Sequence, residues 1–269
     1  MIELFEQDIR TNDRQSSKGN QLKWKKESIW YKADYLGYEG LAEYLISHLL
    51  LKSDLEPSLI TQYRTEQIQY QDRIFLGCAS PDFLQENEQL MTLERLYKNE
   101  TGESLYRSVF RIQEHAARLI FLVNQVERFT NIENFGQYIA QLLIIDLLFL
   151  NEDRHFHNIA LRVSADGVYH FCPVFDMGAC LLSDTRMEYP MNGDIYRMIR
   201  KVRAKTISDD FEEQADIAEQ QYGQAIRFSF TKKDVENLLK DEPYYPAAVK
   251  KRVEDILFEQ MRKYGYLFR

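Results

Sequence analysis

The sequence feature that most constrains the fold is an apolar stretch, residues 135–150, that runs directly into a polar one. Apolar side chains fall on nearly every face of a helix drawn through it, at Phe135, Tyr138, Ile139, Leu142, Leu143, Ile145, Leu148 and Phe149. Such a helix is expected inside a core. Residues 151–158 then read Asn-Glu-Asp-Arg-His-Phe-His-Asn, and seven of these eight side chains are polar. Polar groups beside a core need partners, or each costs about 1–3 kcal/mol. Residues 151–158 are therefore the first place to look for chemistry.

Composition excludes several classes of protein. The 269 residues include 34 Lys+Arg and 42 Asp+Glu, a net charge of −8, and 45% are hydrophobic. This balance is typical of a globular chain and not of a disordered, collagen-like or low-complexity one. Because phosphate neutralisation needs basic surface, the acidic balance argues against a dedicated nucleic-acid binder.

Cysteine usage and hydropathy favour a cytoplasmic protein. The three cysteines, Cys78, Cys172 and Cys180, form no CxxC pair, so we expect neither a disulfide framework nor a thiolate zinc site. The N-terminus lacks the basic and apolar regions of a signal peptide. The most apolar run, 139–150, is shorter than the ~20 residues that cross a bilayer. We expect no membrane partner.

Periodicity and turn residues predict an α+β chain. The expected elements are a strand at 28–33, a helix at 38–51, strands at 61–64 and 72–78, a turn at 79–82, mostly helix over 88–129, the helix at 135–150, a hairpin at 159–163 and 168–171, and helices over 206–265. The Asp166-Gly167 pair favours the hairpin turn. A boundary near 79–90 separates a small strand-rich N-lobe, 1–80, from a larger helical C-lobe, 81–269.

Three residues around the polar segment have the types and order that phosphoryl transfer requires. Asp153 precedes Asn158 by five positions, and Asp176 follows in the turn Asp176-Met177-Gly178. Phosphoryl transfer needs a carboxylate that orients the acceptor hydroxyl, oxygen ligands for Mg²⁺ and a cation on the phosphates. The spacing Asp-x-x-x-x-Asn and the downstream Asp-x-Gly turn match that arrangement. Asn158 and Asp176 are suitable magnesium ligands by type.

The loop Asp153-Arg154-His155-x-x-Asn158, taken with Asp176-Met177-Gly178, resembles the HipA-like kinases. These are bacterial Ser/Thr protein kinases, several of them toxins of toxin–antitoxin systems, and they share a kinase-like fold with the phosphatidylinositol 3- and 4-kinases. The resemblance extends over 138–182 and, more loosely, over 16–50. The chain resembles a core-only form of these kinases, that is, one that consists of the kinase core alone. It implies a two-lobed protein-kinase-like fold, ATP and Mg²⁺ as cofactors, a protein substrate with a Ser/Thr acceptor and an antitoxin-type regulator.

The same resemblance implies roles for the residues of the C-lobe. Asp153 would be the catalytic carboxylate, and Asn158 and Asp176 would bind Mg²⁺. Apart from the resemblance, we expect His155 to brace the loop by hydrogen bonding or to assist near the phosphate. Arg154 would steady the loop or contact phosphate.

In the N-lobe, Lys32 is similar to the lysine that contacts the nucleotide phosphates. Glu43, rather than Glu39, would pair with it, because Glu43 falls inside the following helix. Residues 16–21 would form the loop over the phosphates, with Ser17, Gly19 and Asn20 binding the nucleotide. A linked hypothesis is autophosphorylation at Ser16 or Ser17.

Other interpretations of the sequence stay open. The phosphate loop has one glycine where a Gly-x-Gly-x-x-Gly run is usual, which would suit a catalytically weak nucleotide-binding or partner-binding module on the same fold. A remote alternative is a metal-dependent hydrolase that uses Asp153, His155 and His157. Lys23-Trp24-Lys25-Lys26 is typical of a solvated turn, with nucleic-acid binding as the rival. The basic residues of 197–205 lie three or four apart, so one helical face would be positive and would suit an acidic partner.

Overall fold

The computed structural model describes residues 1–10 and 21–269, which divide into two compact units. Unit 1 contains Met1–Phe83, Phe175–Val202 and Phe228–Arg269, and unit 2 contains Leu84–Val174 and Arg203–Arg227. Each unit is thus assembled from segments distant in the sequence. The proposed division into lobes at 1–80 and 81–269 remains a prediction.

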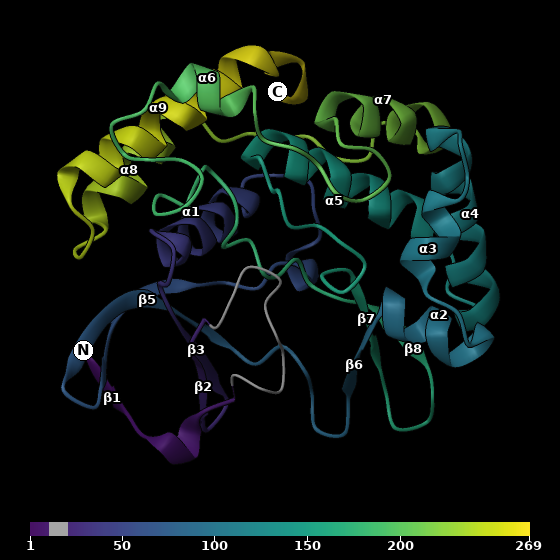
Figure 1. Cartoon of the computed structure of the whole chain (residues 1–269), viewed down its shortest axis with the longest axis horizontal. Helices are drawn as coiled ribbons and strands as arrows, with labels where there is room; N and C mark the ends of the chain where they lie inside the picture. The colour runs from purple at the N-terminus through teal and green to yellow at the C-terminus, as the bar shows by residue number, and fades with distance from the viewer. Residues whose placement is uncertain (11–20) are drawn as a thin grey trace. The chain divides into compact units, whose positions relative to one another are not determined.

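Within its described residues, unit 1 contains a five-stranded sheet of order β1-β4-β5-β3-β2 (Figure 1). The strands are β1 (Ile2–Leu4), β2 (Lys23–Lys26), β3 (Ile29–Ala33), β4 (Arg64–Tyr70) and β5 (Arg73–Pro81). Trp24 pairs with Tyr31, and both side chains are buried in the core on the sheet. The solvated turn predicted for Lys23–Lys26 is therefore wrong, because one face of this short strand buries an indole ring. The turn predicted at 79–82 begins too early, since β5 continues through Pro81.

Helix α1 (Glu39–Leu50) packs against β4 and β5, and Gly40 of its first turn meets Gly77 of β5. A Cβ atom on Gly40 would lie 2.5 Å from the carbonyl carbon of Gly77, and one on Gly77 would lie 2.0 Å from the carbonyl oxygen of Lys32. Both distances are shorter than van der Waals contact. The first turn of α1 can therefore approach β5 at this depth only because Gly40 carries no side chain, and Gly77 in turn allows β5 to lie close to β3.

Gly40→Ala is expected to destabilise the protein by about 1–3 kcal/mol, the usual cost of overpacking, although alanine has the higher helix propensity. Urea unfolding followed by circular dichroism measures the change. Gly265→Ala is the matched control, because a Cβ atom there meets no atom within 4 Å. Equal midpoints for the two variants would contradict the packing argument.

The rest of unit 1 is helical. It contains α6 (Ile195–Ile199), α8 (Lys232–Asp241), α9 (Ala247–Lys263) and the short 3-10 helices Glu6–Asp8, Pro57–Leu59 and Gly265–Leu267. Helix α8 packs against both α9 and α1. Helix α6 ends at Ile199, so the positive helical face predicted over 197–205 does not form.

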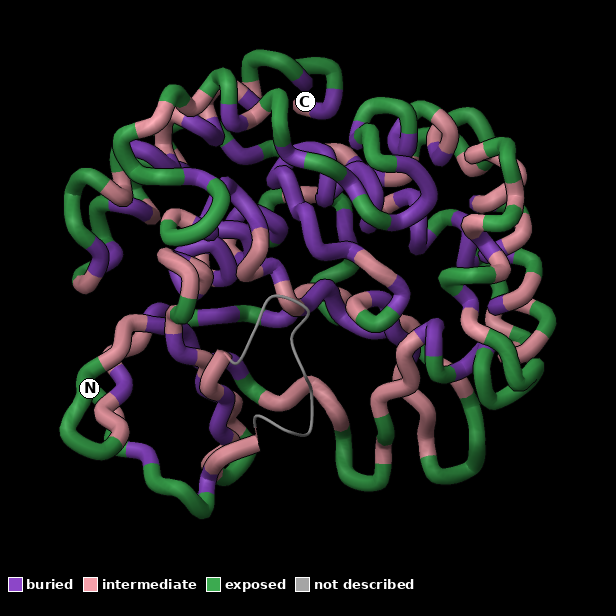
Figure 2. The backbone as a smooth tube through the Cα atoms, viewed as in Figure 1, coloured by how far each residue is buried: buried purple, intermediate pink, exposed green. Residues whose placement is uncertain are grey.

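Unit 2 is built around the apolar helix that the sequence predicts. Its elements are β6 (Gln89–Thr92), α2 (Leu93–Thr101), α3 (Leu105–Phe110), α4 (His115–Thr130), α5 (Phe135–Phe149), β7 (Ala160–Val163), β8 (Tyr169–Phe171) and α7 (Phe211–Tyr222). Nearly every residue of α5 is buried, and α7 lies alongside it (Figures 1 and 2). The predicted hairpin is present as β7 and β8, with Gly167 at φ +82°. Residues Gln89–Thr92 were expected to be helical, but they form a strand because they pair with β7.

The α+β class is confirmed. None of the helices in residues 1–10 and 21–269 has both the length and the apolar character needed to cross a membrane.

Candidate functional site

In unit 1, a lysine joins two carboxylates from separate segments. The Lys32 ammonium on β3 lies 2.6 Å from Glu43 Oε1 on α1 and 2.8 Å from Asp176 Oδ1. The second oxygen of Glu43 accepts the backbone N–H of Met177 at 2.9 Å. Glu43 therefore holds both Lys32 and the turn that carries Asp176.

The choice of Glu43 over Glu39 as the partner of Lys32 is confirmed. The Glu39 carboxylate instead accepts the backbone N–H groups of Tyr35, Leu36 and Gly37, at 2.6–3.1 Å. Glu39 thus orders the loop before α1, while Glu43, one turn further along, faces Lys32.

The charge state of Lys32 is fixed by its neighbours. Burial by itself would lower the pKa of the Lys32 ammonium, but the carboxylates of Asp176 and Glu43 outweigh it and raise that pKa well above its ordinary value. Burial also raises the pKa of the adjacent Cys78 thiol, which favours its neutral form. The cluster therefore presents a permanent cation, the kind of group that phosphate binding needs.

Asp176 has an uncommon backbone conformation, with φ at +58°. Aspartate is among the residues that tolerate the left-handed region best, and functional sites often contain such positions. The conformation turns the chain at the point where the Asp176 side chain meets Lys32.

In unit 2, a buried ion pair anchors the polar segment that follows α5. The Arg154 side chain, 2% exposed, donates to both oxygens of Asp146, 1% exposed, at 3.0–3.2 Å. A further nitrogen, Nη1, donates to the carbonyl oxygen of Asn158 at 3.0 Å. Arg154 thus steadies the loop, one of the two roles that the sequence left open.

The ion pair also explains why a polar residue occurs inside an apolar helix. A lone carboxylate such as Asp146 in a core stretch needs a buried partner, which is the signal that could have identified this pair from the sequence.

The loop brings Asp153 and Asn158 together. The Asn158 amide nitrogen donates to the Asp153 carbonyl oxygen at 2.9 Å and to its Oδ2 at 3.2 Å. The Asp153 backbone N–H donates to the Asn151 side chain at 3.1 Å. Both backbone and side chain of Asp153 are therefore fixed in a largely buried position, 6% exposed.

Two basic side chains lie beside the other oxygen of Asp153. Lys205 Nζ is 3.4 Å from Oδ1, and His155 Nε2 is 3.8 Å from it. Burial lowers the pKa of His155, against the opposing effect of Asp153, so the neutral ring is favoured. In the described part of the chain, the buried Nδ1 of His155 has no hydrogen-bond partner. The ring therefore does not brace the loop through Nδ1.

Lys205 is a site residue that sequence reasoning missed. Its segment is held by Thr206 Oγ1, which donates to the Arg154 carbonyl oxygen at 2.7 Å. The buried Gln214 side chain also accepts backbone N–H groups from this segment, at Thr206, Ile207 and Ser208. The sequence marks Lys205 only as the last member of the basic run 197–205 and not as a neighbour of Asp153, because the tertiary contacts of Thr206 and Gln214 bring it there.

Three predicted nucleotide-binding residues, Ser17, Gly19 and Asn20, lie outside the described residues, as does the predicted autophosphorylation site. Residues 1–10 and 21–269 contain no group of three or more His, Cys, Asp or Glu side chains arranged to hold a metal ion. His155 and His157 lie with their ring centroids 5.7 Å apart.

Asp34, which follows β3, is expected to make the stability of the protein depend on pH. Burial raises its pKa to about 8, with a contribution from the Glu39 carboxylate, while hydrogen bonds from Gly40 and Tyr245 oppose the shift. In an unfolded chain the pKa is about 4. Between these values the folded protein holds a proton that the unfolded chain has lost, so the free energy of unfolding should fall as pH rises from about 4 to about 8.

Asp34→Asn should flatten this part of the profile, measured as urea midpoints at half-unit pH steps. Asp72→Asn, at an exposed turn, should retain the wild-type slope. A slope that persists in Asp34→Asn would assign the pH dependence to another group.

Comparison with known proteins identifies the fold that carries these residues. No protein-family profile matches the chain, and no curated protein matches it by sequence. Its structure is similar to the crystal structure of a Helicobacter pylori proinflammatory kinase, CtkA, with a TM-score of 0.59 and 15% sequence identity, covering 97% of this chain and 94% of that one. The chain has a kinase-like fold. The predicted fold class is thereby confirmed, and at this identity the likeness concerns the fold alone.

Proposed function

We propose that this protein is an ATP- and Mg²⁺-dependent kinase of the HipA-like, core-only type that transfers the γ-phosphate to a Ser or Thr hydroxyl of a protein. The observation that carries the proposal is the cluster of Lys32, Glu43 and Asp176 on a kinase-like fold. Two carboxylates from separate segments meet the Lys32 ammonium on β3, and phosphoryl transfer needs such a cation together with an oxygen ligand for a metal.

By residue type, Asp176 of unit 1 and Asn158 of unit 2 suit a magnesium ion. Asp176 would supply a carboxylate, and Asn158 would supply an amide oxygen, because its amide nitrogen already donates to Asp153. Magnesium prefers such oxygen ligands, and when bound it neutralises negative charge on the phosphates. Lys32 would contact the phosphates, and Ser17, Gly19 and Asn20 would cover them.

Asp153 is the residue proposed to accept and orient the acceptor hydroxyl. Its Oδ2 accepts from Asn158 and its Oδ1 accepts from Lys205, with His155 nearby. We assign the hydroxyl to Oδ1 because the two basic groups lie beside that oxygen. Neutral His155 would act near the transferred group as a hydrogen-bonding partner. The proposal also includes an antitoxin-type regulator as a partner and autophosphorylation at Ser16 or Ser17. We further propose that the protein acts in the cytoplasm.

Transfer of label from γ-³²P-ATP, with and without Mg²⁺, tests this function. Lys32→Met should weaken ATP binding at least about tenfold, the loss expected for a charge-assisted contact of 1.5–3 kcal/mol. Asp176→Asn should remove Mg²⁺-dependent transfer. Lys25→Met is the matched control, because Lys25 is a strand lysine that is also ion-paired, to Asp82 at 2.6 Å.

The outcomes separate the alternatives. Tight ATP binding by wild type without transfer to any protein or to itself would favour the non-catalytic binding module. Absence of ATP binding would overturn the kinase proposal.

A further inference from the structure

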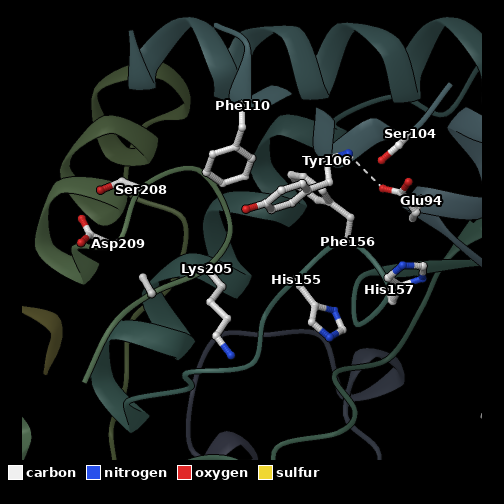
Figure 3. Close-up of a pocket in the computed structure, with 11 residues that line it drawn as sticks. Glu94, Ser104, Tyr106, Phe110, His155, Phe156, His157, Lys205, Ser208 and Asp209 are labelled. Carbon is white, nitrogen blue, oxygen red and sulfur yellow. Dashed lines mark hydrogen bonds between the residues drawn. The ribbon is translucent and has the colours of Figure 1, made fainter. Parts of the chain in front are cut away.

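Unit 2 contains a pocket directly beside the Asp153 loop, with a volume of about 510 Å³ (Figure 3). Its walls come from α3, from the loop after α5 and from the segment before α7. The lining residues that matter here are Tyr106, Phe110, His155, Phe156, Ala204 and Lys205. The volume is within the range of about 300–1,000 Å³ that is typical of ligand sites.

One side of the pocket is aromatic. The rings of Tyr106 and Phe110 lie with centroids 4.4 Å apart and planes tilted by 30°, and the buried Phe156 also lines this space. Tyr106 is 53% exposed, so this wall reaches the protein surface. Exposed aromatic side chains beside a cavity are typical of recognition surfaces for apolar groups.

The aromatic wall is held in place. The Arg118 guanidinium lies over the Phe110 ring, 4.7 Å from its centroid. The same side chain donates to the carbonyl oxygens of Ile112 at 2.8 Å and Ile207 at 2.7 Å. Arg118 therefore ties the end of α3 to the segment that carries Lys205, which keeps the pocket open and preorganised.

The other end of the pocket adjoins the proposed catalytic carboxylate. Lys205 and His155 both line the pocket, and both lie within 4 Å of Asp153 Oδ1. Figure 3 shows their nitrogen atoms at the end opposite Phe110. If one group of a larger molecule were bound in the pocket, the part of that molecule next to the bound group would therefore lie near Asp153 Oδ1, the oxygen assigned to the acceptor hydroxyl.

We propose that this pocket binds an aromatic or large aliphatic side chain of the protein substrate, close in sequence to the Ser or Thr that is phosphorylated. The inference rests on the proposed kinase function and adds the class of acceptor. A peptide is favoured over a small metabolite because the wall is an exposed aromatic surface that continues outward through Tyr106. An apolar side chain is favoured over a charged one because three rings line the space, and Glu94, the nearby buried carboxylate, is already engaged by the Tyr106 backbone N–H at 2.9 Å.

Phosphorylation of a degenerate Ser/Thr peptide library tests the proposal. Each position from three before to three after the acceptor is fixed in turn to every amino acid. Wild type should prefer Phe, Tyr, Trp, Leu or Met at one position. Phe110→Ala should raise KM for the preferred peptide about tenfold, as expected for a lost apolar contact, with kcat and the Kd for MgATP near wild type.

Tyr106→Arg is a second variant, since it changes an exposed side chain and does not depend on repacking the protein. It should reduce the same preference. Tyr196→Ala is the matched control, because Tyr196 is also 53% exposed but belongs to α6 of unit 1 and does not line the pocket.

Three results would overturn the assignment. The first is that wild type shows no preference for an apolar residue at any position of the library. The second is that both pocket variants retain the wild-type preference. The third is that the protein transfers phosphate to small hydroxyl compounds but to no peptide. In the last case, Asp153-dependent ATP turnover would show that phosphoryl transfer from ATP stands, while the protein acceptor and the peptide assignment both fail. Absence of ATP binding would remove both.

Discussion

Asp153→Asn is expected to lower kcat for phosphoryl transfer by about 10²–10⁴-fold, the contribution of a positioned acid–base group. The substitution keeps the size of the side chain but removes the carboxylate that would accept the hydroxyl proton. The Asp153 backbone remains tied to Asn151 and Asn158, so the loop should keep its conformation. The Kd for MgATP should change little, because the nucleotide contacts are assigned to other residues.

Initial rates at saturating ATP, with isothermal titration of MgATP, separate these two quantities. Asp216→Asn is the matched control, since Asp216 is an exposed carboxylate on α7 in the same unit. If Asp153→Asn transferred phosphate at the wild-type rate, another residue would have to orient the acceptor. A loss of ATP binding in this variant would instead point to a structural role.

Arg154→Ala is expected to destabilise the protein by about 3–5 kcal/mol, the range for removing one partner of a buried ion pair. Asp146 would be left in the core without its counter-charge, since it accepts three hydrogen bonds from Arg154. The carbonyl oxygen of Asn158 would also lose a donor. Urea unfolding of purified unphosphorylated protein measures the loss.

Two comparisons sharpen this test. Arg262→Ala removes an exposed arginine that pairs with Glu259, and its midpoint should stay close to wild type. Asp146→Leu with Arg154→Met replaces the pair by apolar side chains, which should recover much of the lost stability. Transfer activity should not recover in the double variant, because Asn158 would still lack the Arg154 contact. A double variant with full activity would show that the pair is needed only for folding.

Hydrophobic periodicity and turn residues identified those elements of the fold whose conformation depends on residues nearby in the sequence. The apolar faces of 135–150 predict α5 within one residue of its observed end, and Asp166-Gly167 predicts the hairpin. Gln89–Thr92 was not recognised as a strand, because its four residues acquire that conformation from pairing with β7. Lys23–Lys26 was misread for a similar reason, since its lysines conceal one buried tryptophan.

For the candidate site too, the sequence predicted some features and missed others. The sequence by itself determined which residues have the chemistry, Asp153, Asn158 and Asp176, because residue type and spacing are local properties. The pairing of Glu43 with Lys32 was also expected before the structure, from the family resemblance and the position of Glu43 in its helix. Only the tertiary structure decided that Arg154 pairs with Asp146 and that Lys205 lies beside Asp153. Those contacts join residues 8 and 52 positions apart. Such partners meet because the packing of the chain buries them side by side. The spacing of a motif along the sequence gives no information about that packing.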